Sequence, residues 1–165
     1  MSREEMIALF LDNAGKAAAG VSRATGTTEL PRALSEIVPK SAAVYCPDVT
    51  ALEKAVVGLF KHHVPDYAKA DVTVEEVLGG IAETGSIVCT STGGRAVQAS
   101  LLPAHHVAIL PVDKIYPTLE EFFASLSAAP PTNIAIITGP SRTADIELTL
   151  AIGVHGPERL DIIVI

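Results

Sequence analysis

The sequence predicts an α/β protein built around a mostly parallel β-sheet with helices on both faces, and two observations lead to it. Short aliphatic runs of strand length alternate with helical segments, and short connections between such elements favour parallel strands joined by right-handed crossovers. Hydrophobic residues make up 48% of the chain but aromatic residues only 4%, which suits a core of small aliphatic side chains. The 165 residues are enough for one domain with one core, which we expect to span residues 1–165.

Helix and strand patterns alternate in the first half of the chain. Ser2 and Glu5 have capping-box spacing ahead of an apolar run, which predicts a first helix that ends near Gly15. The same spacing recurs in Thr50 with Glu53 and in Thr73 with Glu76. The further elements expected here are a strand at 20–24, a helix at 30–38, a strand at 42–46, a helix at 50–61, a loop at 62–69, a strand at 70–74 and a short helix reaching residue 79.

The second half contains four compact aliphatic runs, each of which has the length of a buried strand. They cover residues 86–90, 107–110, 134–138 and 160–165. Thr118 with Glu121 predicts a helix that carries Phe122, and the segment 143–152, acidic near its start and mostly apolar in the rest, predicts another helix that ends at Gly153. Ligands of such folds bind outside the carboxyl ends of the strands.

Charge and cysteine content exclude several classes of protein. A formal charge of −7 without a basic cluster argues against nucleic-acid binding. No basic leader or long apolar run is visible, so we expect a cytoplasmic protein without membrane insertion. The two cysteines, Cys46 and Cys89, lack Cys-x-x-Cys spacing, so this chain alone cannot hold an iron–sulfur cluster or a cysteine-rich zinc site. Each is expected to be a buried small hydrophobe.

The turn after the predicted strand at 134–138 is the first candidate binding site. Where a strand is followed directly by a helix, the backbone N–H groups at the helix start point outward, which predicts an anion site. Arg142 offers a bidentate fork to a carboxylate or phosphate, whereas Ser141 and Thr143 either cap the helix or reach the ligand. Asp145 is either an acid at the helix start or an acid–base group. The candidate binding residues of this turn are Gly139, Pro140, Ser141, Arg142, Thr143 and Asp145.

Glycine and hydroxyl residues bracket the predicted strand at 86–90 and form a second candidate segment. Gly93 and Gly94 allow either a close approach to a ligand or an ordinary glycine turn. Glu83 is a candidate general base or nucleophile if it is desolvated. The candidate binding residues of this segment are Thr84, Gly85, Ser86, Gly93 and Gly94.

The histidines are weaker candidates for ligand or metal binding than the two segments above. His105 and His106 immediately precede a predicted strand, so their side chains should point to opposite faces, and we expect no metal site made by both. His106 is retained as a candidate binding residue. His155 either caps carbonyls at the end of the predicted helix or contacts the ligand.

Four segments of the chain resemble the lactate-utilisation protein C family, which is defined by the LUD domain. They read Ala-Glu-Thr-Gly-Ser at 82–86, Leu-Pro-x-His-His at 102–106, Thr-Gly-Pro-Ser-Arg-Thr-Ala-Asp-Ile-Glu at 138–147 and Gly-Val-His-Gly-Pro at 153–157. The resemblance covers roughly residues 70–165. It implies a fold like that of CoA transferases, sugar-phosphate isomerases and 5-formyltetrahydrofolate cyclo-ligase. Members are often longer, so the N-terminal portion looks abbreviated.

The resemblance also implies a role beside iron–sulfur oxidoreductase subunits that oxidise L-lactate to pyruvate. Two hypotheses of different classes follow. In the first, the chain is an accessory subunit that binds a small carboxylate or phosphate or helps to assemble a lactate-oxidising complex; it holds no cofactor, and the iron–sulfur clusters belong to partner subunits. In the second, it is a stand-alone enzyme for a phosphorylated or acyl-activated small molecule, with Glu83 or Asp145 as the acid–base group. The first is preferred, because the sequence contains no device for holding a redox cofactor.

Overall fold

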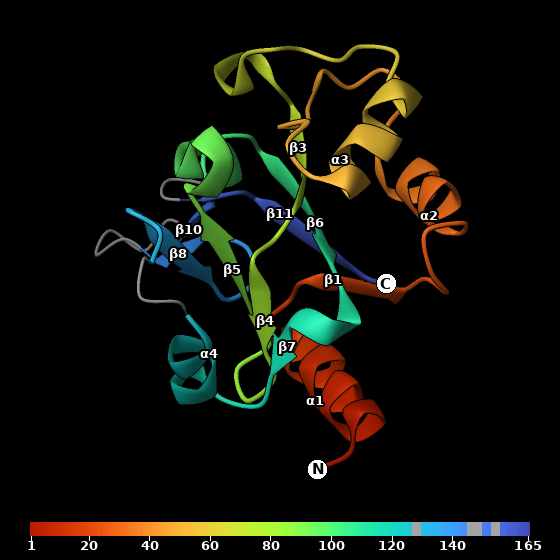
Figure 1. The fold of residues 1–165 in the computed structure, drawn as a ribbon. Coiled ribbons are helices and arrows are strands. Elements are labelled where there is room, and N and C mark those ends of the chain that lie inside the picture. The colour runs from red at the N-terminus through yellow and green to blue at the C-terminus, as the bar shows by residue number, and fades with distance from the viewer. Residues whose placement is uncertain (127–129, 145–149, 153–155) are drawn as a thin grey trace.

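The computed structural model describes residues 1–126, 130–144, 150–152 and 156–165 and has the predicted α/β architecture. A five-stranded parallel sheet forms its centre (Figure 1). Its strands, in spatial order, are β1 (Gly20–Arg23), β11 (Arg159–Val164), β6 (His105–Leu110), β3 (Val72–Glu76) and β2 (Val44–Tyr45). The three central strands are buried almost throughout, as expected for a parallel sheet that is covered on both faces.

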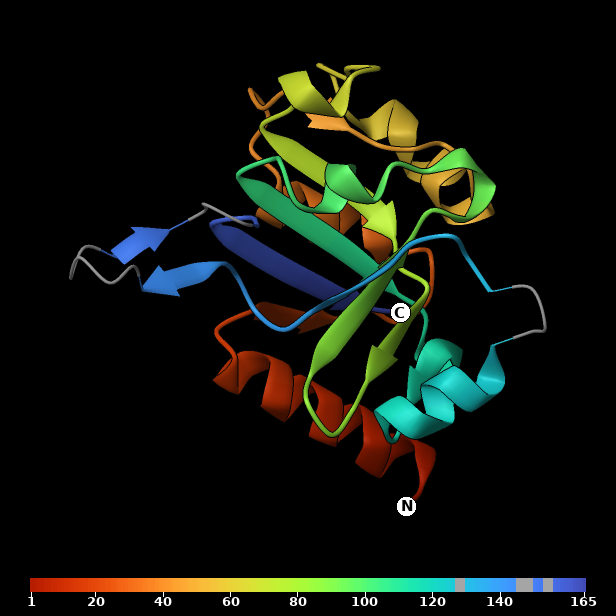
Figure 2. The ribbon, with the colours of Figure 1, turned by 90° about the vertical axis from the view of Figure 1, so that its left-hand side faces the viewer.

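Helices and a second sheet cover the two faces of the parallel sheet (Figures 1 and 2). One core cluster joins one face to α2 (Leu30–Ile37) and α3 (Ala51–Val56). A second cluster joins the other face to α1 (Arg3–Lys16) and the second sheet. No helix in the described ranges is both long enough and apolar enough to cross a membrane.

The second sheet has four strands and mixed directions. In spatial order they are β7 (Ile115–Tyr116), β4 (Gly79–Ile81), β5 (Ser86–Thr90) and β8 (Ile134–Ile137). β5 pairs antiparallel with both β4 and β8. The helix α4 (Leu119–Ser125) covers its outer face, where Phe122 packs with Ile81 and Val88. The sequence does not predict the direction of these strands, because an aliphatic run has the same pattern in a parallel and in an antiparallel ladder.

Short 3₁₀ helices connect several of these elements. They are η1 (Val57–Leu59), η2 (Tyr67–Lys69), η3 (Thr92–Gly94), η4 (Val97–Ser100) and η5 (Val112–Lys114). The predicted helix at 50–61 therefore divides into α3 and η1 and ends earlier than expected.

Two of the three capping-box predictions are confirmed. The Ser2 hydroxyl accepts the Glu5 N–H at 3.2 Å while the Glu5 carboxylate accepts the Ser2 N–H at 2.6 Å. Thr50 and Glu53 make the same reciprocal pair at the start of α3. Each pair satisfies backbone donors that a helix start leaves open.

The third capping-box prediction, a short helix opened by Thr73 with Glu76, is wrong. Both residues lie inside β3, where Thr73 stands opposite His106 of β6. The β-branched Val72, Thr73 and Val74 suit a strand, and ladder pairing with β6 outweighs the local capping pattern.

The predicted helix at 143–152 is also wrong in the part that the structure describes. Arg142–Ala144 form β9 and Leu150–Ile152 form β10, and the two strands pair antiparallel, with Arg142 opposite Ile152. The segment combines the acids Asp145 and Glu147 with aliphatic residues, and it carries β-branched Thr143 and Ile152. A short run of this kind fits a strand as well as a buried helix, so periodicity alone does not separate the two.

Candidate functional site

The turn at residues 139–143 lacks the helix that made it a predicted anion site. Ser141 donates its backbone N–H to the carbonyl of Pro157 at 2.8 Å, and Arg142 and Thr143 lie in strand β9. Within the described residues no helix starts at this turn to favour an anion, and the Ser141 amide is already hydrogen-bonded within the protein. Ligand binding by Arg142 stays a prediction that depends on its guanidinium alone. Asp145 and His155 lie outside the described residues.

The structure joins the start of this turn to the segment at 82–86 through three hydroxyl groups. The Ser86 Oγ lies 2.6 Å from the Thr84 Oγ1 and 2.7 Å from the Thr138 Oγ1. This chain of hydrogen bonds connects β5 to the end of β8, its neighbour in the second sheet. The two sequence motifs are therefore adjacent in space, although they are separated along the chain.

Gly85 and Gly139 pack against the end of α1. Both have positive φ angles, of 68° and 72°. A Cβ atom on Gly85 would lie 2.1 Å from the backbone nitrogen of Ala14, and one on Gly139 would lie 2.0 Å from the carbonyl oxygen of Ala17. Only glycine fits at these contacts. The two glycines thus serve close packing between the second sheet and α1. Pro140, which follows Gly139, is half-buried.

Glu83 has a structural partner and is not desolvated. Its side chain is exposed, and its carboxylate accepts the backbone N–H of Leu119 at the start of α4, at 2.8 Å. The condition that makes Glu83 a candidate base or nucleophile, removal from water, is not met in this structure.

Gly93 and Gly94 form an exposed turn directly after β5, with φ angles of 73° and 81°. This arrangement matches the ordinary glycine turn that the sequence left open as an alternative. The turn leads the chain into Arg95, whose side chain enters the interior of the protein and is 6% exposed.

The two adjacent histidines point to opposite faces of the parallel sheet, as predicted. The Nε2 of His105 lies 2.6 Å from the Oδ2 of Asp161, which also contacts the Nε of Arg159 at 2.7 Å. His106 faces the second sheet and is fully buried. The two rings therefore belong to different environments.

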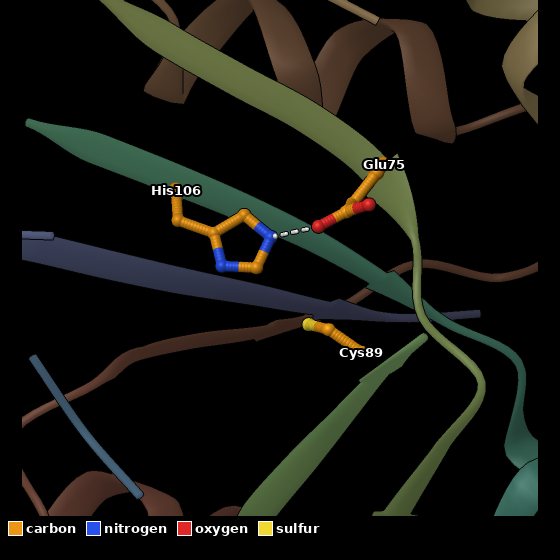
Figure 3. A group of neighbouring side chains, drawn as sticks. All are labelled: Glu75, Cys89 and His106. Carbon is orange, nitrogen blue, oxygen red and sulfur yellow. Dashed lines mark ion pairs between the residues drawn. The ribbon is translucent and has the colours of Figure 1, made fainter. Parts of the chain in front are cut away.

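His106 meets Glu75 and Cys89 in what we call the interior cluster, the strongest candidate site in the described residues (Figure 3). Glu75 comes from β3, Cys89 from β5 and His106 from β6, so both sheets contribute. One donor atom of each residue lies within 4.8 Å of the others. Figure 3 shows the three side chains pointing toward one another, with the imidazole Nε2 3.0 Å from the Glu75 Oε1.

The imidazole of His106 is poorly satisfied in this position. Its contact with Glu75 does not meet hydrogen-bond geometry, and neither ring nitrogen has a hydrogen-bond partner among the described residues. The hydroxyl of Thr73, opposite His106 in the ladder, is likewise buried without a partner. Buried polar groups are normally hydrogen-bonded, so unsatisfied ones call for a physical explanation.

A buried guanidinium holds the carboxylates on one side of the interior cluster. Arg95 contacts Glu53 at 2.7 Å and Glu75 at 3.5 Å, and it donates to the carbonyl oxygen of Glu76 at 2.7 Å. Glu53 is fully buried and also accepts the backbone N–H of Glu76 at 2.9 Å. The Glu76 carboxylate pairs with Lys114 at 2.7 Å.

The pKa values of the interior cluster shift in opposite directions. Burial by itself raises the pKa of Glu75, but the His106 imidazole, the Ser100 hydroxyl and Arg95 outweigh it, so the pKa lies below its usual value. Ser100, on η4, donates a hydrogen bond to Glu75. Burial raises the pKa of Cys89 well above its usual value, and the charge of Glu75 adds to this effect. Glu75 is therefore a buried carboxylate, whereas Cys89 by itself is an unreactive thiol.

Glu75, Cys89 and Arg95 are the residues that the sequence motifs do not predict. One local indication of a functional site exists: Glu75 and Glu76 follow Val72 and Val74 directly, and charged residues are rare in a buried strand. The capping-box spacing of Thr73 with Glu76 instead predicts a helix for this segment, and a glutamate is ordinary on a helix surface. Both cysteines are free and buried, as predicted, but only the tertiary fold places Cys89 beside an imidazole and a carboxylate.

Comparisons with known proteins agree with this architecture. A family model described as the LUD domain matches residues 65–165. The chain is 37% identical over 108 residues to Lactate utilization protein C of Macrococcus caseolyticus, covering 62% of this chain and 46% of that protein. It is also 37% identical over 103 residues to Lactate utilization protein C of Halalkalibacterium halodurans, covering 59% and 45%. The chain thus spans less than half the length of these curated relatives.

A solved structure resembles the whole chain. The crystal structure of a DUF162 family protein from Deinococcus radiodurans superimposes with a TM-score of 0.75 at 26% sequence identity. The superposition covers 99% of this chain and 98% of that one. The similarity therefore includes the N-terminal residues that the family model does not match.

Proposed function

This chain belongs to the LUD domain family, and from that premise we propose that it is a component of an L-lactate utilisation system, in which lactate is oxidised to pyruvate. The observation that carries the proposal is the similarity to proteins named Lactate utilization protein C in several bacteria. The matched region includes β3, β5 and β6, which supply the interior cluster.

Within this system we propose an accessory subunit that binds a small carboxylate or phosphate or helps to assemble the complex. Its partners are iron–sulfur oxidoreductase subunits. The support is chemical: iron–sulfur clusters are held chiefly by four cysteine thiolates, and this chain has two cysteines, both buried. Electron transfer then belongs to the partners, and this chain contributes recognition or assembly.

The alternative, a stand-alone enzyme, is favoured by one observation, the interior cluster. Ionisable side chains in a protein interior are frequent at active sites, although structural ion-pair networks produce the same pattern. The exposed Glu83 is a poor acid–base group because it is hydrogen-bonded at the start of α4. In this alternative Glu75 or His106 acts on a phosphorylated or acyl-activated small molecule without any partner subunit.

Deletion and copurification test the preferred function. A strain of the native host that lacks this chain should grow poorly on L-lactate, and the wild-type chain should restore growth. A tagged chain purified from cells grown on L-lactate should carry iron–sulfur proteins with it. Normal growth of the deletion strain on L-lactate, or purification without any iron–sulfur protein, would contradict the proposal. Turnover of an acyl-CoA or a sugar phosphate by the chain alone would favour the alternative.

A further inference from the structure

We propose that Glu75, Cys89 and His106 together bind one divalent transition-metal ion of the zinc type. This inference concerns the chain by itself and does not depend on the lactate proposal. It reverses the expectation from the sequence, where neither the spacing of the cysteines nor the histidine pair indicates a metal site. The structure instead brings one ligand from each of three strands to a common point.

The donor set is of the kind that Zn²⁺ uses. An imidazole nitrogen, a thiol sulfur and a carboxylate oxygen are its three common protein ligands, and three protein ligands leave one position for water or a small molecule. The donor atoms lie within 4.8 Å of one another. In a tetrahedral zinc site they would be separated by about 3.3–3.6 Å, given metal–ligand distances of about 2.0–2.3 Å. A side-chain adjustment of about 1 Å therefore completes the site.

The unsatisfied imidazole is an independent indication of a ligand. His106 is fully buried and faces the cluster; in the described part of the chain its Nδ1 has no hydrogen-bond partner, and its Nε2 has only the ion-pair contact with Glu75 at 3.0 Å. A metal ion bound at one nitrogen would satisfy the lone pair that the imidazole now leaves unused. The carboxylate of Glu75 also has lone pairs left to coordinate a metal ion, because Ser100 and Arg95 occupy only part of its four lone-pair sites.

The charge of the network favours a bound cation. Glu53 and Glu75 carry two negative charges, whereas Arg95 supplies one positive charge, and the Glu76 carboxylate is balanced separately by Lys114. This leaves one surplus negative charge among buried groups, which is costly without compensation. A divalent ion with a Cys89 thiolate adds one net positive charge and removes the surplus. The ion pair between the His106 Nε2 and the Glu75 Oε1, which lie 3.0 Å apart, is the competing explanation that the experiment tests.

The hydrogen bonds around Glu75 fit the role of supports for a metal ligand. Ligating carboxylates are themselves usually hydrogen-bonded, which fixes their orientation. Ser100 and Arg95 hold Glu75 from η4 and from the chain just after η3. Both supports come from the segment between β5, which carries Cys89, and β6, which carries His106.

Cobalt titration of the purified full-length chain tests the inference, because a Co²⁺–thiolate bond gives a near-ultraviolet charge-transfer band. We expect one Co²⁺ per chain with this band, and displacement of Co²⁺ by Zn²⁺. Cys89→Ser should abolish the band and weaken metal binding by about tenfold or more. The matched control is Cys46→Ser, which changes the other buried cysteine and should retain the band.

Two further variants keep the result interpretable. If Cys89→Ser does not fold, Cys46→Ser decides the question, because any thiolate band in that variant must come from Cys89. His62→Ala with His63→Ala removes an adjacent exposed histidine pair that is able to bind metal at the surface. A folded wild-type chain without a thiolate band, or metal binding that survives in Cys89→Ser and is lost with His62 and His63, would overturn the inference in favour of a metal-free ion pair between His106 and Glu75.

Discussion

Replacing Arg95 by alanine should be among the most destabilising changes in this protein, because it removes the cation that two buried carboxylates share. The guanidinium is 6% exposed and contacts Glu53 at 2.7 Å and Glu75 at 3.5 Å. Removal of one partner from a buried ion pair leaves an uncompensated charge and costs about 3–5 kcal/mol. Domains of this size have a free energy of unfolding of about 5–15 kcal/mol in total. Arg95→Ala should therefore lower it by a large fraction.

Urea denaturation at pH 7, followed by far-ultraviolet circular dichroism, measures this effect. Arg32→Ala is the matched control, since Arg32 also pairs with a glutamate, Glu36, but is 84% exposed. The control should change the free energy of unfolding by less than about 1 kcal/mol. Arg95→Lys should be intermediate, because an ammonium group cannot form the planar fork that contacts both carboxylates.

A double substitution separates charge from packing. If the cost of Arg95→Ala comes from unpaired carboxylates, Glu53→Gln should cost less in that background than in the wild type, with a coupling energy of about 0.5–3 kcal/mol. Arg95→Ala with stability equal to that of Arg32→Ala would refute the reasoning. So would strict additivity of the two substitutions.

Three other predictions follow from particular contacts. Gly85→Ala should lower stability by about 2–5 kcal/mol, because its Cβ would lie 2.1 Å from the Ala14 nitrogen at a φ of 68°; Gly94→Ala, at a φ of 81° in open space, should cost only about 1–2 kcal/mol in the same denaturation assay. Burial raises the pKa of Asp161, but His105 and Arg159 outweigh it and hold that pKa below its usual value, so its stabilising effect is present above the unfolded pKa and is lost as the pH falls through the lower, folded pKa. Unfolding midpoints measured from pH 6 to pH 3 should therefore fall less steeply in Asp161→Asn, and an unchanged slope would show that this pair is not responsible. If Arg142 binds a small carboxylate, lactate or pyruvate should raise the melting temperature of the wild type but not of Arg142→Ala, and equal shifts would exclude that role.

Local patterns in the sequence were reliable where neighbouring residues decide the structure. The capping boxes at Ser2 and Thr50 start helices as expected, since both partners of each pair lie within four residues. The aliphatic runs that form β5, β6 and β11 are buried strands. The opposite orientations of His105 and His106 follow from the two-residue repeat of a strand.

Those same local patterns failed where a longer-range contact competes with them. The spacing of Thr73 with Glu76 resembles a helix cap, but pairing with β6 makes the segment a strand. The segment at 143–152 fits either class of structure, and pairing between β9 and β10 decides it in the part that the structure describes. A hydrogen-bonded ladder involves a partner elsewhere in the chain, so its energy does not appear in the local sequence.

The sequence by itself therefore determined the fold class, the family resemblance and the reduced, buried state expected of both cysteines. Only the tertiary structure decided that Glu75, Cys89 and His106 converge, and that Arg95 enters the interior to hold the carboxylates. The physical reason is that three strands of two different sheets supply these side chains. Their proximity depends on how the sheets pack, and sheet packing is set by the sum of many aliphatic contacts that no short motif encodes.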